Sequence, residues 1–240
     1  MLLILPIQAI DLDGKEARYI KEIFAYGTTK ITITVDLKVK NSSGRNINNK
    51  VIQYAAKIIA ARIENMYSKV DEKTRTTYMF KVNSIQVVNK IDPSKDFSVE
   101  LVSWEPESDG SIILGRTGEI GNAKNNVFKL NINACIPPEQ LVRTSGHELG
   151  HELGMRHPKN EVNASGSDPE SDLTVEESPN NLIRQSSYIS GTDVIIKQLN
   201  KIIETIDKAG QGTTITHESK PTTSPSVNTE YKVNTTNGDQ

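Results

Sequence analysis

The feature that most constrains this chain is the eleven-residue run H-E-L-G-H-E-L-G-M-R-H, which extends from His147 to His157. The run contains three of the four histidines in the sequence. A helix advances about 100° per residue, so His147 and His151 lie one turn apart on the same face. Two imidazoles at this spacing can bind one metal ion, because zinc–nitrogen bonds are only about 2.0–2.1 Å long. The fold must therefore contain a helix that presents this face to a metal.

Gly154 explains how the third histidine, His157, can join the other two. If the helix continued, residue 157 would point well away from the face that carries His147 and His151. A glycine can adopt a positive φ, which ends a helix and turns the chain back. We therefore expect a helix over residues 138–153, followed by a return of the chain beneath the metal.

Three neutral imidazoles leave the fourth position of a tetrahedral zinc ion open, which is typical of catalytic rather than structural sites. Zinc lowers the pKa of a bound water towards ~7 and polarises a substrate carbonyl. Glu148 lies just beside the metal face, so it can take the proton of that water and pass it to the leaving amine. The run thus predicts peptide-bond hydrolysis without a covalent intermediate. In this prediction Zn²⁺ is held by His147, His151 and His157, and Glu148 is the general base.

Two other interpretations of the run stay open at this point. One is a set of surface histidines on a helix, which the concentration of three histidines in a single window disfavours. The other is a different zinc hydrolase built on the shorter pattern H-E-x-x-H. Gly154 and His157 disfavour this second interpretation, because the shorter pattern requires neither residue.

The rest of the chain shows both periodicities of regular secondary structure. Apolar residues at every second position predict strands over residues 31–40, 76–88, 97–104, 112–114 and 127–134. Apolar residues at helical spacing predict a long helix over residues 51–70, with Val51, Ile58 and Ile63 on one face beside the polar Arg62. A last helix is expected after residue 192, with Thr192 as its cap. This order predicts an α+β fold in which a mixed sheet packs against helices.

The pattern H-E-x-x-H-x-x-G-x-x-H resembles the signature of the metzincin clan of zinc metallopeptidases. The resemblance implies a twisted mixed sheet with two long helices, the second of which carries the first two zinc ligands. It also implies a small C-terminal subdomain with a Met-turn-like loop and a terminal helix. The expected division is an N-terminal extension (1–28), an upper catalytic subdomain (29–154), a lower subdomain (155–209) and a disordered tail (210–240). The tail is rich in Thr, Ser and Asn and has too few apolar residues to fold.

The resemblance also implies a methionine in the turn beneath the zinc, and here the chain departs from the family pattern. The best match for this turn, residues 180–185, has Ile183 at the methionine position. Isoleucine is apolar and of similar volume, and such an exchange usually costs less than about 1.5 kcal/mol. The departure leaves a second function open, namely a catalytically silent zinc-binding module used for recognition.

The N-terminal region bears on origin and localisation. Residues 10–17, I-D-L-D-G-K-E-A, resemble the short segment that closes the core of bacterial Rhs-type repeat proteins and precedes their variable toxin domains. The first ten residues are apolar but lack the basic n-region and the cleavage site of a signal peptide. A secreted or delivered bacterial effector, or a toxin-associated domain, is therefore favoured. An ordinary β-turn explains the same eight residues.

The motif predicts a protein or peptide substrate, and composition gives no sign of nucleic acid or of a membrane as a partner. The net charge of −2 gives no basic surface for nucleic acid, and no apolar run reaches the roughly 18 residues of a membrane span. Residues 115–121 are glycine-rich and are expected to form either an edge strand that binds substrate backbone or a flexible hairpin. Cys135, the single cysteine, is expected to face the core rather than to bind zinc in a latent form. The acidic residues between positions 161 and 177 lack the fixed spacing of a calcium loop. No recognisable motif encodes cleavage specificity or oligomeric state.

Overall fold

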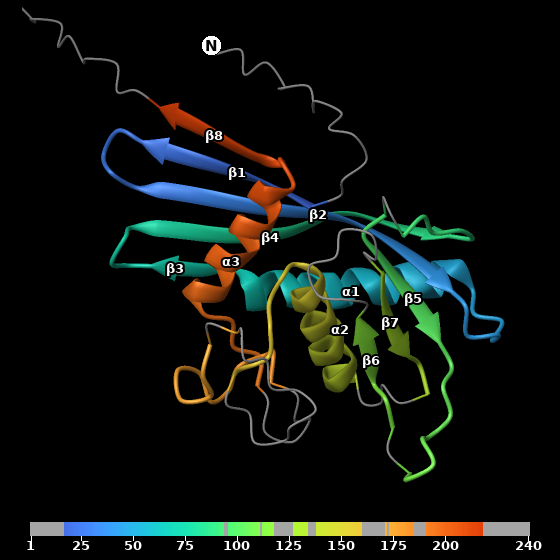
Figure 1. The fold of residues 1–240 in the computed structure, drawn as a ribbon. Helices are drawn as coiled ribbons and strands as arrows, with labels where there is room; N and C mark the ends of the chain where they lie inside the picture. The colour runs from blue at the N-terminus through green and yellow to red at the C-terminus, as the bar shows by residue number, and fades with distance from the viewer. Residues whose placement is uncertain are drawn as a thin grey trace, which may run out of the picture.

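The computed structural model describes residues 17–93, 96–110, 112–117, 127–133, 138–159, 171, 173–184 and 191–217. Strands and helices in these residues form a mixed α+β architecture around one sheet (Figure 1). In chain order the elements are β1 (Ala17–Phe24), β2 (Thr29–Asn41), α1 (Asn49–Tyr67), β3 (Lys69–Asp71), β4 (Thr76–Val88), β5 (Ser98–Val102), β6 (Gly115–Thr117), β7 (Val127–Asn131), α2 (Pro138–Glu152), α3 (Ile196–Lys208) and β8 (Gly212–His217).

The long strand β2 organises the sheet, because three other strands pair with it. β4 runs parallel to β2 along one edge. The other edge is shared, since antiparallel β1 pairs with residues 29–35 and parallel β5 pairs with residues 38–41. One branch continues from β5 to parallel β7 and then to antiparallel β6. The second branch continues from β1 to parallel β8, and the short β3 pairs with the start of β4.

The alternating sequence of β2 gives this strand one buried face and one polar face. Ile33 and Val35 point into the core and are 0% exposed. Side chains one position away point to the opposite face of the sheet. On that face Lys40 forms an ion pair with Glu100 of β5 at 3.0 Å. The polar face therefore matches charges across neighbouring strands.

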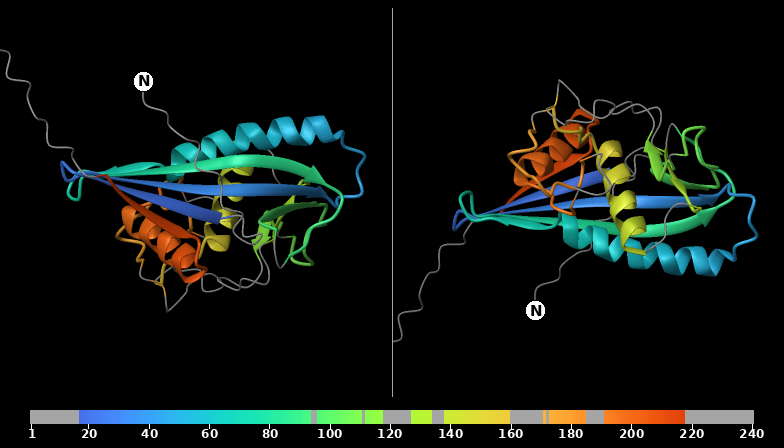
Figure 2. Two further views of the ribbon diagram at one scale, coloured as in Figure 1. Left: turned by 90° about the horizontal axis from the view of Figure 1, so that it is seen from above. Right: turned by 90° about the horizontal axis from the view of Figure 1, so that it is seen from below.

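α1 runs alongside the long strands β2 and β4, on the side opposite to α3 (Figure 2). Side chains at the C-terminal end of α1 accept hydrogen bonds from backbone amides of β4, in the part of β4 that follows its pairing with β3. Glu64 accepts a hydrogen bond from the Val82 amide at 2.8 Å, and the helix C-cap, Ser68, accepts one from the Phe80 amide at 3.0 Å. Unpaired backbone groups at a sheet edge invite pairing with other chains. α1 therefore satisfies part of this edge as well as covering it.

One hydrophobic core joins the sheet to all three helices. Its fully buried members come from elements far apart in sequence, which is why α2 is held in the middle of the molecule. They include Ile33, Val35, Tyr67, Phe80, Phe128, Leu149, Leu182, Ile183, Leu199 and Ile202.

The α+β prediction with a mixed sheet and helices is confirmed, but three strands lie where none was expected. The short β3 follows α1, which ends at Tyr67 and not at residue 70 as predicted. β1 lies within the presumed N-terminal extension, and β8 lies within the tail that was predicted to be disordered. The disorder prediction is therefore wrong for residues 212–217. Gly210 has a φ of +71° and turns the chain at the end of α3. At Gly212 a Cβ would lie 2.6 Å from the Tyr19 ring, so glycine allows β8 to approach β1.

Smaller differences concern the ends of elements. The short strand expected over residues 112–114 is wrong in position, because β6 occupies residues 115–117. Thr192 is not the cap of the last helix, which has Ile195 at its N-cap. Cys135 and residues 10–16 of the Rhs-like segment lie outside the described residues. Among the helices that the structure describes, none combines the length and the apolar character needed to cross a membrane.

Candidate metal centre

The first two histidines are positioned by α2, which begins at Pro138 and carries the acidic Glu139 in its first turn. Proline suits the first turn of a helix because its missing amide would have no intrahelical partner there, and Glu139 complements the helix dipole. Val142 and Leu149 are buried and pack α2 against the core. The Tyr67 hydroxyl also donates a hydrogen bond of 2.6 Å to a carbonyl of α2, that of Gly146. The helix is thus fixed from several sides.

Gly154 ends α2 with the pair of hydrogen bonds that define a Schellman motif. The Met155 amide donates to the Gly150 carbonyl at 2.8 Å, and the Gly154 amide donates to the His151 carbonyl at 2.9 Å. Gly154 has a φ of +91°, as the sequence predicted for a glycine that turns the chain. A Cβ at this position would lie 2.4 Å from Thr205 Oγ1 of α3. The turn brings His157 back beneath the helix.

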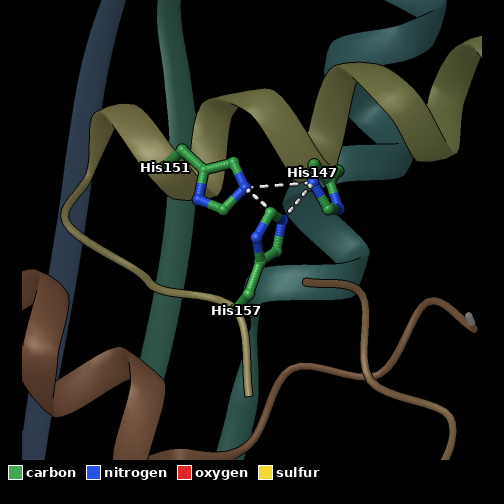
Figure 3. Close-up of side chains that lie close together, drawn as sticks. All are labelled: His147, His151 and His157. Carbon is green, nitrogen blue, oxygen red and sulfur yellow. Dashed lines mark hydrogen bonds between the residues drawn. The ribbon is translucent and has the colours of Figure 1, made fainter. Parts of the chain in front are cut away.

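The three histidines of the eleven-residue run meet at one point (Figure 3). The Nε2 atom of His151 lies 3.0 Å from that of His147 and 3.0 Å from that of His157, and the third separation is 3.3 Å. Zinc–nitrogen bonds of about 2.0–2.1 Å at tetrahedral angles require nitrogen atoms about 3.3 Å apart. The three side chains therefore fit one metal ion.

Backbone carbonyls orient two of the three rings. His147 Nδ1 lies 2.9 Å from the Leu182 carbonyl oxygen, and His151 Nδ1 lies 2.9 Å from the Met155 carbonyl oxygen. Because a carbonyl oxygen only accepts hydrogen bonds, each Nδ1 carries the proton and each Nε2 is left with its lone pair. Burial, together with the neighbouring His151, lowers the pKa of His147 well below its usual range. His147 is therefore a neutral imidazole at neutral pH, the form that binds a metal.

The Leu182 carbonyl belongs to a tight turn over residues 181–184, in which the Arg184 amide donates to the Asn181 carbonyl at 3.4 Å. The buried Asn181 and Gln198 side chains exchange two hydrogen bonds of 2.8 and 3.0 Å, which tie the turn to α3. Asn181 Oδ1 also accepts from the Ile183 amide at 2.9 Å. The turn is therefore held by Asn181 and Gln198, which do not belong to the group of possible metal ligands.

Ile183 is 0% exposed and lies under the histidine helix. A Cβ on Gly150 would meet Ile183 Cδ1 at 2.5 Å and the Tyr67 hydroxyl at 2.8 Å. Gly150 and Ile183 thus share one small volume next to His151. The assignment of Ile183 to the methionine position of the family pattern stays a prediction.

Glu148 is 7% exposed and lies against the end strand β6. A Cβ on Gly115 would be 2.8 Å from Glu148 Oε1 and 2.9 Å from Thr144 Cγ2, so only glycine fits opposite this carboxylate. Burial, and then the charge of Glu148, raise the pKa of Glu152 to about 8. Near neutral pH, Glu152 is therefore mainly protonated and adds no second full charge one turn away from Glu148.

Several residues of the site could not be recognised from the sequence. The Leu182 and Met155 carbonyls are backbone groups, which any residue type provides. Asn181 and Gln198 are distant in sequence and gave no motif. Gly115, by contrast, belongs to the glycine-rich stretch that was expected to form either an edge strand or a hairpin, and it forms a strand.

Comparisons with known proteins leave the site as the main evidence for function. No protein-family model and no curated protein matches the chain. One solved structure that matches is described as "Structure of a chaperone-substrate complex", with 17% sequence identity and a TM-score of 0.39. The match covers 73% of this chain and 35% of that one, so this chain spans about a third of the length of the chain it matches. A similarity this low carries no argument about function.

Proposed function

We propose that this protein is a zinc-dependent endopeptidase of the metzincin type, in which His147, His151 and His157 hold the zinc and Glu148 is the general base. The observation that carries the proposal is the convergence of three Nε2 atoms at 3.0, 3.0 and 3.3 Å from one another. A three-histidine set leaves one coordination position that no other His, Cys, Asp or Glu of the described residues joins, as in catalytic zinc sites.

The metal would supply one function, and the chain supplies two. Bound zinc would act as a Lewis acid that polarises a peptide carbonyl and activates water. Glu148 accepts a proton from the attacking water and delivers it to the leaving nitrogen, so that the bond breaks without a covalent intermediate. The carbonyls of Leu182 and Met155 hold the His147 and His151 rings in the orientation that metal binding requires.

The position of β6 supports a peptide as the substrate. β6 is the last strand on its side of the described sheet, and a Cβ on its residue Gly115 would lie 2.8 Å from Glu148 Oε1. An extended peptide can add to such a strand by main-chain hydrogen bonds. This mode of binding would bring the substrate backbone next to the general base.

A silent zinc-binding recognition module is the second candidate function, because Ile183 replaces the methionine that the family resemblance implies. Glu148 distinguishes the two candidates. A recognition module needs the histidines but has no use for a base beside them.

Substitution of Glu148 tests the proposal. We expect Glu148→Gln to bind one zinc per chain, as the wild type does, and to lose at least about a hundredfold in hydrolysis of a denatured protein. Glu139→Gln, which changes an exposed glutamate in the first turn of the same helix, is the matched control and should keep full activity. Equal hydrolysis by wild type and Glu148→Gln would refute the catalytic proposal and favour the silent module. Absence of zinc uptake by the wild type would exclude both.

A further inference from the structure

A cavity lies on the far side of α2, away from the three histidines. It has a volume of about 210 Å³ and is lined by α1, α2 and the sheet strands between them. Val39, Phe128 and Leu149 are among its lining residues. Protein interiors rarely contain voids larger than a water molecule, because the atoms that line a void lose their packing contacts. A cavity of this size is therefore suited to a ligand.

Ser145 gives the cavity its one polar side chain among the lining residues that the structure describes. It is 3% exposed, and its Oγ atom is buried with no hydrogen-bond partner among the described residues. A buried hydroxyl that makes no hydrogen bond is unfavourable. A ligand that places one hydrogen-bonding group beside Ser145 would satisfy it.

The lining also specifies the charge and size of the ligand. None of the described lining residues carries a charge, and an ion without a partner is costly to bury. An apolar cavity of about 150 Å³ is enough for benzene, so this one takes roughly seven or eight carbon atoms. The exposed Val51 of α1, which is 59% exposed, also lines the cavity, so the ligand has access from the surface.

From these observations we propose that the cavity between α1, α2 and the sheet binds a small neutral apolar molecule that carries one hydroxyl or carbonyl group, which hydrogen-bonds to Ser145. This site does not depend on the proposed peptidase function, since no histidine of the metal centre lines it. One of its lining residues, Leu149, belongs to α2, the helix that also carries His147 and His151.

Calorimetric titration with benzyl alcohol, toluene and benzoate tests the proposal on zinc-free protein. The wild type is expected to bind one benzyl alcohol and one toluene per chain, with a thermal unfolding temperature that rises with ligand concentration. Benzoate, which is of similar size but charged, is expected not to bind. Lack of saturable binding of both neutral probes would overturn the proposal.

Two variants locate the site and test the role of Ser145. Ser145→Ala removes the hydroxyl with little change of shape, and it should raise the ratio of the benzyl alcohol to the toluene dissociation constant about tenfold. Ala56→Leu fills the cavity and should abolish binding of both probes. Val70→Ala, on the exposed strand β3, is the control and should bind both as the wild type does. An unchanged ratio in Ser145→Ala would overturn the hydrogen bond, and unchanged binding by a folded Ala56→Leu would overturn the location.

Discussion

Gly146 and Gly150 let side chains from other elements reach the backbone of α2. A Cβ on Gly146 would lie 3.0 Å from Met66 Cε and 3.3 Å from Leu182 Cδ2. A Cβ on Gly150 would clash with Ile183 Cδ1 at 2.5 Å and with the Tyr67 hydroxyl at 2.8 Å. Glycine inside a helix costs about 1 kcal/mol relative to alanine, so these contacts must offset that cost. The histidines form the candidate metal centre, and the glycines beside them allow the supporting residues to approach.

Gly154→Ala tests the most constrained of these glycines. The substitution places a Cβ at a positive φ and against Thr205, so we expect it to lower the free energy of unfolding by about 2 kcal/mol or more. His157 is displaced at the same time, and zinc affinity should fall. Urea denaturation and a competition titration with a chromogenic zinc chelator measure the two effects.

Gly44→Ala is the matched control for this experiment. Gly44 also has a positive φ, of +74°, but a Cβ there would meet nothing within 4 Å. It should show only the backbone cost of about 1–2 kcal/mol and no change in zinc affinity. Equal effects of the two substitutions on zinc binding would contradict the role assigned to Gly154.

At the scale of elements, the candidate metal centre depends on the joint placement of α2, the turn over residues 181–184 and α3. α2 contributes His147 and His151, whereas the turn contributes the Leu182 carbonyl and Ile183. The turn has little regular structure of its own, and the Asn181–Gln198 pair connects it to α3. α3 thus stabilises the site without contributing a ligand.

Asn181→Ala should break the hydrogen bonds that connect the turn over residues 181–184 to α3. It leaves the Gln198 side chain and the Ile183 amide without their partner in a buried region, which costs about 2–3 kcal/mol of stability. The Leu182 carbonyl is then less well fixed, and we expect a loss of about 10- to 100-fold in zinc affinity. Asn180→Ala changes the exposed neighbouring residue of the same type and should affect neither quantity. Similar zinc affinities in the two variants would show that the amide pair is not needed for the site.

The sequence predicted the local part of this arrangement and missed the part formed between distant segments. The spacing of His147, His151 and Gly154 follows from helix geometry, which is fixed over one or two turns. Ile183 was singled out by the family resemblance alone, and its burial under α2 is a contact between distant segments. β8 was missed because its pairing with β1 joins segments about 190 residues apart, and because β8 has little apolar character of its own. β1 was missed although it forms a local antiparallel hairpin with the neighbouring β2. The exposure of Val51 and Ile58 also differs from the predicted apolar face, since α1 packs on the edge of β4 through other residues.

At the scale of the whole molecule, Asp36 connects three strands at the point where the two branches of the sheet separate. It accepts hydrogen bonds from Arg18 of β1 at 2.8 Å and from Asn83 and Ser84 of β4 at 2.8 and 2.7 Å. Desolvation raises the pKa of Asp36, but the hydrogen bonds from Ser84, Arg18 and Asn83 outweigh it and lower the pKa below 3.8. The carboxylate thus stabilises the folded sheet in its ionised form.

The lowered pKa predicts how stability changes with acid. The unfolded chain binds the proton more readily, so the contribution of Asp36 is present above about pH 4 and is lost as the pH falls through the lower folded value. We expect Asp36→Asn to cost about 1 kcal/mol at pH 7, because the group is partly exposed. The difference from the wild type should shrink below pH 4. Urea denaturation between pH 2.5 and 7 measures it, and a constant difference over that range would contradict the assignment.

The parallel pairing of β1 with β8 has a mechanical consequence. Six residue pairs join the two strands, from Tyr19 with Gly212 to Phe24 with His217. Because the strands are parallel, the start of β1 and the end of β8 lie at opposite ends of this ladder. A force that pulls these two ends apart acts along the strands and loads all of their hydrogen bonds together, instead of opening them one by one. When the chain is held under tension at both ends, this sheet is therefore built to resist unfolding by shear.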